Sequence, residues 1–365
     1  MTMADRGVTV VVGGQFGDEG KGKIVAYMAL KDNPDIIARA GVGPNAGHTV
    51  YKDGKRFALR MIPCGFVNEN SKLFIGAGVL VDVQQFLKEV EITETEGRVM
   101  IDKRCGIIEE KHKKQDSSDS YLSKKVGTTG SGCGPANAER AHRTIKLAQE
   151  IPELRDYVTD VPMEINSGIS DGKRILVESS QGFGLSLFYG TYPFVTSKDT
   201  TAGMAAVDIG ISPLRIRDVI VIYKAYTTRV GEGPMNSFID EENIRRYPLW
   251  QRVLKMAKEQ GISGRNVNEI LADYLKERGT VTGRPRRIGN FDFSLAKYSA
   301  MVNGATQIGI TCLDKLFPKC FKLREYDKLP ENAKNYIEMI EREVGVKATL
   351  ISTGPGIYDT IDLRK

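Results

Sequence analysis

The 365-residue sequence is poor in cysteine, histidine and long apolar runs, and each shortage excludes a class of protein. Its five cysteines include no CxxC pair, so we expect neither a disulfide framework nor a structural zinc site, but a reducing, cytoplasmic location. The three histidines include no HExxH motif of a zinc protease. No apolar stretch approaches the roughly 20 residues that span a bilayer, and the polar segment Met1–Gly7 indicates no signal peptide.

Charge of one sign is also scarce. The formal net charge is only +6, and the densest basic stretches, Lys111–Lys114 and Arg284–Arg287, are short. A nucleic-acid-binding domain usually concentrates its positive charge, so we expect no nucleic-acid partner and, without an apolar span, no membrane partner.

Glycine, in contrast, is abundant. The chain has 38 glycines, which is about 10% against a usual level of about 7%, and they form short clusters beside apolar runs.

Apolar runs and helical patterns alternate along the whole chain. Val8–Val12 is β-branched throughout, which is typical of a strand buried on both faces of a parallel sheet. The other expected strands are Leu73–Ile75, Ile175–Val177, Val219–Ile222 and Ile308–Thr311. The expected helices include Ile24–Leu30, Val83–Ile92, Ala136–Gln149 and Asn332–Val344. This alternation predicts one large α/β domain over residues 1–365, with a mostly parallel central sheet and flanking helices. Charged residues 240–278 predict a helical excursion on that sheet.

The first glycine cluster, residues 13–23, follows the first expected strand and predicts a P-loop-like phosphate loop before a helix. Lys21 could reach a phosphate there. The loop is not a Walker A motif, because Gln15 and Gly22 stand where that motif needs glycine and a hydroxyl. Asp18 instead places a carboxylate inside the loop. It would repel a phosphate unless it binds a metal or moves a proton, and a plain helix-capping turn with a solvated Asp18 is the alternative.

Four further segments offer polar groups at loops. His48 lies in Pro44–Thr49 and titrates near neutrality, although a lone histidine is more often structural. Gly127–Pro135 has the composition of a phosphate loop or of a flexible surface loop. Gly283–Arg287 clusters guanidiniums that suit carboxylates or phosphates, unless it is a solvated face. Thr311–Asp314 follows a strand, where an aspartate could accept two hydrogen bonds from a guanine.

Eight motifs occur in one order along nearly the whole chain: GQFGDEGKGKIV, NAGHTV, VGTTGSGCGPA, QGFGLSLFYGTYPFVTSKDTTAG, TRVGEGP, GTVTGRPRR, LDKL and ISTGPG. Together they resemble the adenylosuccinate synthetase family, in particular its compact archaeal-type members. The resemblance implies a homodimeric, GTP- and Mg²⁺-dependent ligase of purine biosynthesis that condenses L-aspartate with IMP through a 6-phosphoryl intermediate, giving adenylosuccinate, GDP and phosphate.

The resemblance also implies the catalytic roles. Asp18 would be the general base that takes the N1 proton of the purine, and His48 the general acid. Lys21 would neutralise the transferring phosphoryl group, and Gln181 would contact the nucleotide at the reacting centre. Mg²⁺ would be held by Asp18 and the carbonyl oxygen of Gly47.

The substrate contacts follow from the same resemblance. IMP would be bound by Asn45, Thr129 and Thr196 at its 5′-phosphate, by Gln181, and by Arg143 of the other subunit. L-Aspartate would be bound by Thr282, Arg284 and Arg286. GTP would be bound by Gly17, Glu19, Gly20, Lys21, Gly22, Asp314, Ser352 and Gly354.

The chain departs from the family pattern at several positions. Ser179 replaces a glycine near the purine, Pro285 interrupts the run of arginines, and Cys312 replaces the lysine of the guanine site. Ser179 could accept a hydrogen bond from a guanine 2-amino group, so the same chemistry on dGMP, as in viral 2-aminoadenylosuccinate synthetases, is an alternative. A GTP-binding switch or an RNA-binding module is the alternative from another class, against which Asp18 and His48 count.

Overall fold

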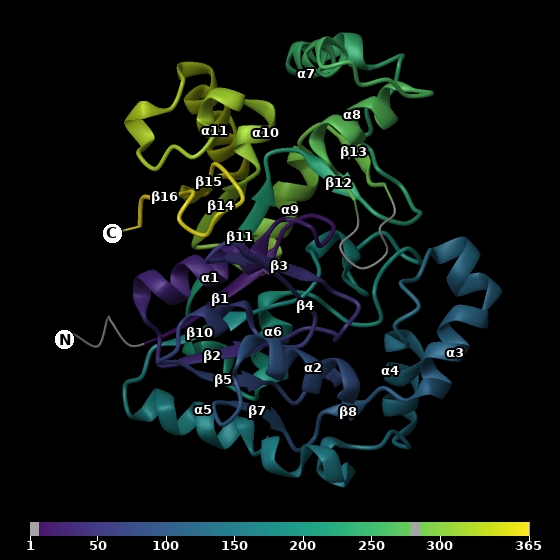
Figure 1. Cartoon of the computed structure of the whole chain (residues 1–365), viewed down its shortest axis with the longest axis vertical. Helices are drawn as coiled ribbons and strands as arrows, with labels where there is room; N and C mark the ends of the chain where they lie inside the picture. The colour runs from purple at the N-terminus through teal and green to yellow at the C-terminus, as the bar shows by residue number, and fades with distance from the viewer. Residues whose placement is uncertain (1–6, 279–284, 365) are drawn as a thin grey trace.

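A ten-stranded sheet forms the centre of the chain, whose computed structural model describes residues 7–278 and 285–364 (Figure 1). The strand order is β16-β15-β14-β11-β1-β10-β2-β5-β7-β9. Every pairing is parallel except that of β15 with β16. The strands are β1 (Val8–Gly13), β2 (Ile36–Arg39), β5 (Lys72–Ile75), β7 (Val99–Asp102), β9 (Val158–Thr159), β10 (Ile175–Glu178), β11 (Ile216–Lys224), β14 (Gln307–Thr311), β15 (Ala348–Ser352) and β16 (Thr360–Asp362).

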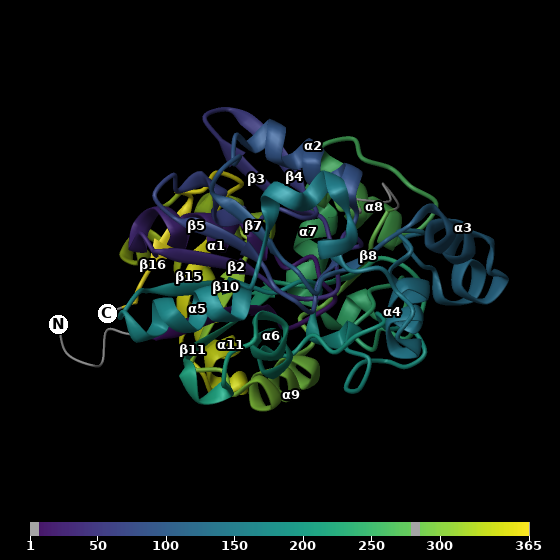
Figure 2. The same cartoon turned by 90° about the horizontal axis from the view of Figure 1, so that it is seen from below.

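Strand β1 lies between β10 and β11 and is buried on both faces, as its β-branched sequence predicts. Val10 and Val12 face one apolar core, and Val11 faces a second. The first core includes residues of α5 (Val161–Ser170), α6 (Ala202–Ile209), α9 (Phe293–Asn303) and α11 (Glu331–Val344). The second includes residues of α1 (Lys21–Asp32) and α2 (Val83–Thr93). The fold therefore has helices on both faces of the sheet, with α2 on one side and α6 and α9 on the other (Figure 2).

Three short two-stranded sheets accompany the central one: β3 (His48–Lys52) with β4 (Lys55–Leu59), β6 (Leu80–Val81) with β8 (Gly106–Ile107), and β12 (Thr227–Arg229) with β13 (Arg287–Gly289). Among the described residues, no helix is long and apolar enough to cross a membrane.

The structure confirms the α/β fold and each strand expected from an apolar run. The helix expected over Ala136–Gln149 is wrong in its second half. Helix α4 runs from Cys133 to His142, because Arg143 adopts a left-handed conformation with φ 67° that ends it.

Residues 240–278 include α7 (Pro248–Glu259) and α8 (Val267–Leu275). Trp250 on α7 is fully buried and its ring meets Tyr226 edge-on at a centroid distance of 5.8 Å. It shares the apolar core of β1. In Figure 1 α8 lies beside β13, and α7 lies farther out, next to α8. Buried apolar residues of both α7 and α8 therefore belong to the same core as Val10 and Val12 of β1.

Candidate active site

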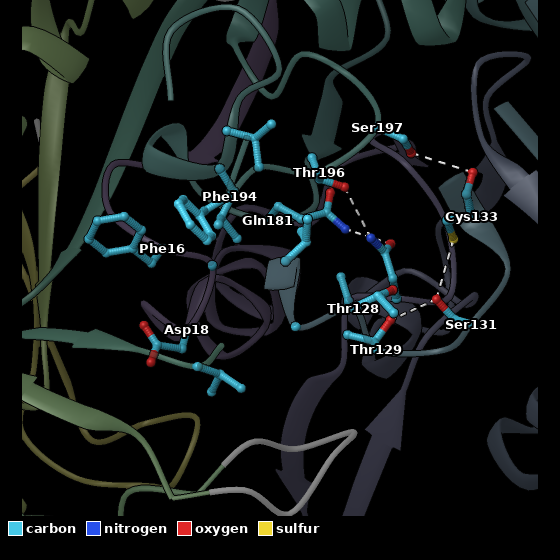
Figure 3. A pocket seen from close by; sticks show the side chains of 18 of the residues that line it. Phe16, Asp18, Thr128, Thr129, Ser131, Cys133, Gln181, Phe194, Thr196 and Ser197 are labelled. Atoms are coloured by element: carbon cyan, nitrogen blue, oxygen red, sulfur yellow. Dashed lines mark hydrogen bonds between the residues drawn. The ribbon is translucent and has the colours of Figure 1, made fainter. Parts of the chain in front are cut away.

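A cavity of about 540 Å³ is lined by loops that follow the central strands (Figure 3). It takes residues from segments 16–22, 45–49, 126–134 and 181–197, and also includes Arg286. In parallel sheets, ligands bind beyond the carboxyl ends of the strands. The structure thus brings the first three glycine-rich or polar clusters of the sequence around one cavity, together with Arg286 of the fourth cluster.

The phosphate loop differs from a Walker loop in the group that its backbone amides bind. Gly20 caps α1 with φ 78°, a left-handed conformation that suits glycine. The Glu19 carboxylate, fully buried, accepts hydrogen bonds from the backbone N–H groups of Gln15 and Gly17 at 2.9 Å each, and from Lys21 at 2.7 Å. The Glu19 carboxylate therefore occupies two backbone N–H groups of the loop. The groups that remain to bind an incoming phosphate are the N-terminus of α1 and the glycines that face the cavity.

The Asp18 carboxylate has one anchored oxygen and one free oxygen. Its Oδ2 accepts hydrogen bonds from the Thr228 hydroxyl and from the Lys224 ammonium, the latter at 3.5 Å. The Nε of Arg286 lies 3.1 Å from the same oxygen. Oδ1 is buried and has no hydrogen-bond partner among the described residues, and Asp18 lines the cavity (Figure 3). The carboxylate is thus held in place while one oxygen can accept a substrate proton or bind a cation.

His48 also keeps one ring nitrogen free. Its Nδ1 is hydrogen-bonded to Oε1 of Glu178, and Arg39 forms an ion pair with that oxygen at 2.9 Å. Burial, together with the charge of Arg39, lowers the pKa of His48 from 6.5 to about 4. Burial alone would raise the pKa of Glu178, but Arg39 and His48 lower it to about 2. At pH 7 His48 is therefore neutral. Its Nδ1 lies against Glu178 and 2.6 Å from Nη1 of Arg39, and its buried Nε2 has no partner among the described residues.

Neutral hydrogen-bonding groups form another part of the wall. Gln181 donates to the side-chain oxygen of Asn45 at 2.7 Å, and Asn45 donates to the Thr196 hydroxyl at 3.2 Å (Figure 3). The Oε1 of Gln181 is buried without a partner among the described residues. These groups can bind a polar ligand without adding charge.

The loop over residues 127–134 is anchored rather than free. Asp116 on α3 (Glu110–Ser118) accepts hydrogen bonds from the Thr128 hydroxyl and from the backbone N–H of Gly132, both at 2.8 Å. The Thr129 and Ser131 hydroxyls lie 2.8 Å apart and line the cavity. The loop therefore presents hydroxyls to the cavity from a fixed position.

The residues predicted to contact guanine lie beside the first turn of α1 and are not among those lining the cavity. Lys23 donates to the Ser352 hydroxyl at 2.5 Å and to the carbonyl oxygens of Gly354 and Asp359 at 2.6 Å each. Burial lowers the pKa of Lys23 to about 8. Asp314 begins the nearby α10 (Leu313–Leu316), and burial raises its pKa. Lys23 thus connects the phosphate-loop helix to the turn that carries the predicted guanine contacts.

The remaining predicted residues fall in different places. Arg286 lines the cavity, whereas Thr282 and Arg284 lie outside the described residues. Arg143 is exposed at the end of α4 and does not line the cavity of its own chain. Glu19 is buried beneath the phosphate loop.

Sequence reasoning missed the residues that hold the others. They share buried or nearly buried positions and direct contacts with a predicted site residue, and they are Lys23, Arg39, Glu178, Lys224, Thr228 and Glu277. Arg39, Glu178 and Lys224 each end a buried strand. A charged residue directly at the end of an apolar run was therefore the sequence signal that could have identified these three residues.

Comparison with known proteins assigns the chain to a recognised group. The profile of the family described as adenylosuccinate synthetase matches residues 10–151, 144–320 and 317–361. An adenylosuccinate synthetase of Methanosphaera stadtmanae is 53% identical over 359 residues, covering 98% of both chains. One of Archaeoglobus fulgidus is 54% identical, covering 98% of this chain and 99% of the relative.

Solved structures agree at the level of the fold. The fully ligated adenylosuccinate synthetase of Plasmodium falciparum superposes with a TM-score of 0.82 at 25% identity, covering 98% of this chain and all of that chain. The succinoaminodeoxyadenylate synthetase of cyanophage S-2L, bound to dGMP and dATP, has a TM-score of 0.76 at 20% identity, covering 99% and 96%.

Proposed function

The chain belongs to the adenylosuccinate synthetase family and is a ligase that forms a carbon–nitrogen bond, and we propose the following substrates and residue roles for it. It condenses L-aspartate with IMP at the expense of GTP, and it releases adenylosuccinate, GDP and phosphate. One observation in the site carries the proposal. A carboxylate oxygen of Asp18 and a ring nitrogen of His48, both buried and both without partners among the described residues, line the same cavity as the phosphate loop.

The reaction has two steps. The free oxygen of Asp18 takes the N1 proton of IMP, so that O6 attacks the γ-phosphate of GTP and GDP leaves. The amine of L-aspartate then displaces phosphate from C6. Phosphoryl transfer depends mostly on positioning and on stabilising developing charge. Lys21 supplies positive charge at the phosphate loop, and protonated His48 stabilises the charge on the leaving side, because an entering phosphate raises the pKa of a neighbouring imidazole.

The donor set fits Mg²⁺. The unpartnered Oδ1 of Asp18 is a hard oxygen ligand, and Gly47, whose carbonyl would be the second protein ligand, lines the same cavity. Bound there, the ion would neutralise charge on the phosphates of GTP. IMP is bound by Asn45, Gln181 and Thr196 with Thr129, and GTP by the phosphate loop with Asp314, Ser352 and Gly354.

The test is an assay of phosphate release with GTP and L-aspartate, in which IMP, GMP and dGMP are offered separately. We expect turnover with IMP that depends on aspartate. A GTP-binding switch would release phosphate without aspartate, and an RNA-binding module would release none. A higher kcat/KM with dGMP than with IMP would contradict the assignment of the purine.

The structure weakens the case for dGMP. That alternative depends on Ser179 meeting a purine 2-amino group. Ser179 is 1% exposed, its hydroxyl donates to the carbonyl oxygen of Ser180 at 3.4 Å, and it is not among the residues that line the cavity. The phage enzyme that binds dGMP shares the fold at 20% identity, whereas the archaeal relatives named above share about half of all residues.

Replacing Arg286 by leucine should raise the KM for L-aspartate by about 10- to 100-fold, because a charged hydrogen bond to a carboxylate is lost. The KM values for IMP and GTP should change much less. Steady-state kinetics with each substrate varied in turn would measure the difference. Equal increases in all three KM values would remove Arg286 from the aspartate site.

The proposed assembly is a homodimer in which Arg143 reaches the IMP site of the partner subunit. Leucine at position 143 should weaken IMP binding in the homodimer. When this variant is mixed with an Asp18→Asn variant, random pairing should restore about a quarter of the wild-type activity, since one of the two sites in each heterodimer is complete. Activity that stays at the level of the separate variants would contradict a shared site.

The proposed location is the cytoplasm, where nucleotides are available and the five free cysteines stay reduced.

A further inference from the structure

Four buried charged groups, two acidic and two basic, meet beside the cavity. The Nζ of Lys224 lies 3.0 Å from Glu277 and 3.5 Å from Asp18. The Nη1 of Arg286 lies 2.5 Å from the other oxygen of Glu277. The four side chains are between 2% and 14% exposed. Buried charges are stable only when they are paired, so the four groups depend on one another.

Glu277 is the member of this group that no role above explains. It comes from the end of the 240–278 segment, just after α8, where Lys276 adopts φ 56° and ends the helix. The backbone N–H of Glu277 donates to Ala272 at 2.8 Å, and its carbonyl oxygen accepts from the backbone N–H of Arg286 at 3.1 Å. Glu277 therefore holds Arg286 through both its backbone and its carboxylate.

The contacts of Glu277 determine which part of Arg286 stays available. Burial would raise the pKa of Glu277, but Lys224 and Arg286 lower it to about 2, so the group is charged. It binds Nη1 of Arg286, while Nε of Arg286 forms an ion pair with Asp18 at 3.1 Å and Nη2 has no hydrogen-bond partner among the described residues. Arg286 lines the cavity. Glu277 thus holds Nη1 of the guanidinium and Asp18 holds Nε, so that Nη2 remains for a ligand.

We propose that Glu277 is a positioning residue of the aspartate site, which holds Nη1 of Arg286 so that the free part of the guanidinium meets a carboxylate of L-aspartate. This rests on the proposed function, in which Arg286 binds aspartate. Glu277 itself touches no substrate. The proposal also gives the 240–278 segment a role, since that segment delivers the Glu277 carboxylate to Arg286.

Substituting Glu277→Gln keeps the size of the side chain and removes its charge. We expect the KM for L-aspartate to rise by about 10-fold or more, since a charged hydrogen bond that orients Arg286 is lost, with the KM values for IMP and GTP within about twofold of wild type. A purely structural role would move all three KM values together, and that result would overturn the proposal.

A double substitution separates positioning from folding. Glu277→Gln alone leaves Lys224 poorly compensated and lowers the temperature of thermal unfolding. Glu277→Gln combined with Lys224→Gln removes one charge of each sign, so we expect that temperature to recover. The KM for L-aspartate should stay high in the double variant and rise much less in Lys224→Gln alone, because Lys224 contacts Asp18 and Glu277 but not Arg286. An aspartate KM that recovers together with the unfolding temperature would contradict the proposal.

Tyr226→Phe is the matched control. The Tyr226 hydroxyl donates to the same carboxylate of Glu277, but its removal leaves all four charges in place, so the aspartate KM should stay within about twofold of wild type. A rise as large as that of Glu277→Gln would show that packing causes the effect. Wild-type protein without aspartate-dependent turnover would instead refute the proposed function. An active wild type whose aspartate KM is unchanged by Glu277→Gln refutes this inference alone.

Discussion

Asparagine in place of Asp18 should lower kcat by about 10²- to 10⁴-fold, the usual contribution of a general base. Asparagine keeps the size of the side chain and its hydrogen bond from Thr228, but it cannot take a proton from N1 of the purine. GTP binding should stay within about tenfold of wild type, because the base acts mainly in the transition state. Steady-state kinetics and calorimetric titration with GTP would measure the two quantities.

Asp116→Asn is the control for this prediction. Asp116 is also a buried carboxylate that lines the cavity, but both of its oxygens are already hydrogen-bonded, so its loss should affect the KM for IMP more than kcat. If turnover survives in Asp18→Asn, Asp18 is not the base. If excess Mg²⁺ restores the rate of that variant, Asp18 serves chiefly to hold the metal.

Asparagine in place of His48 should also reduce kcat by about 10²- to 10⁴-fold. The reason is that Nε2, a buried and unpartnered nitrogen that can protonate in response to a phosphate, is lost. Glu178→Gln should reduce kcat less, because it removes the group that orients the ring and leaves the ring itself. Unchanged turnover in His48→Asn would contradict the role of an acid at this position.

Nuclear magnetic resonance of labelled histidine can test the protonation of His48 directly, since the chain has only three histidines. Burial and Arg39 lower the pKa of His48 to about 4, so the free protein should show a neutral ring at pH 7. Binding of GTP should raise that pKa, because phosphate charge favours the protonated ring. His112, buried between α3 and α4 and paired with Glu139 at 2.5 Å, lies outside the cavity lining and should not respond.

Local patterns in the sequence predicted much of this molecule. The β-branched run Val8–Val12 predicted the buried strand β1, since a strand inside a parallel sheet is apolar on both faces. The glycine cluster after it predicted a phosphate loop, and the missing Walker hydroxyl drew attention to Asp18. Helix α4 was predicted too long because the left-handed conformation of Arg143 depends on its surroundings and not on its residue type.

The partners that make Asp18 and His48 useful could not be predicted in this way. Glu178 lies 130 residues from His48 and meets it only because β10 ends beside the start of β3. Lys224 lies 206 residues from Asp18, and their contact depends on β11 pairing with β1.

The sequence by itself determined the class of fold, the position of the phosphate loop and the two residues proposed for proton transfer. These depend on neighbouring residues, whose apolar pattern and backbone freedom act over a few positions of the chain. Only the tertiary structure decided which oxygen of Asp18 and which nitrogen of His48 lack a partner among the described residues, and that Glu277 holds Arg286. Those facts depend on which distant charges are buried together, and the order of strands in the sheet sets that.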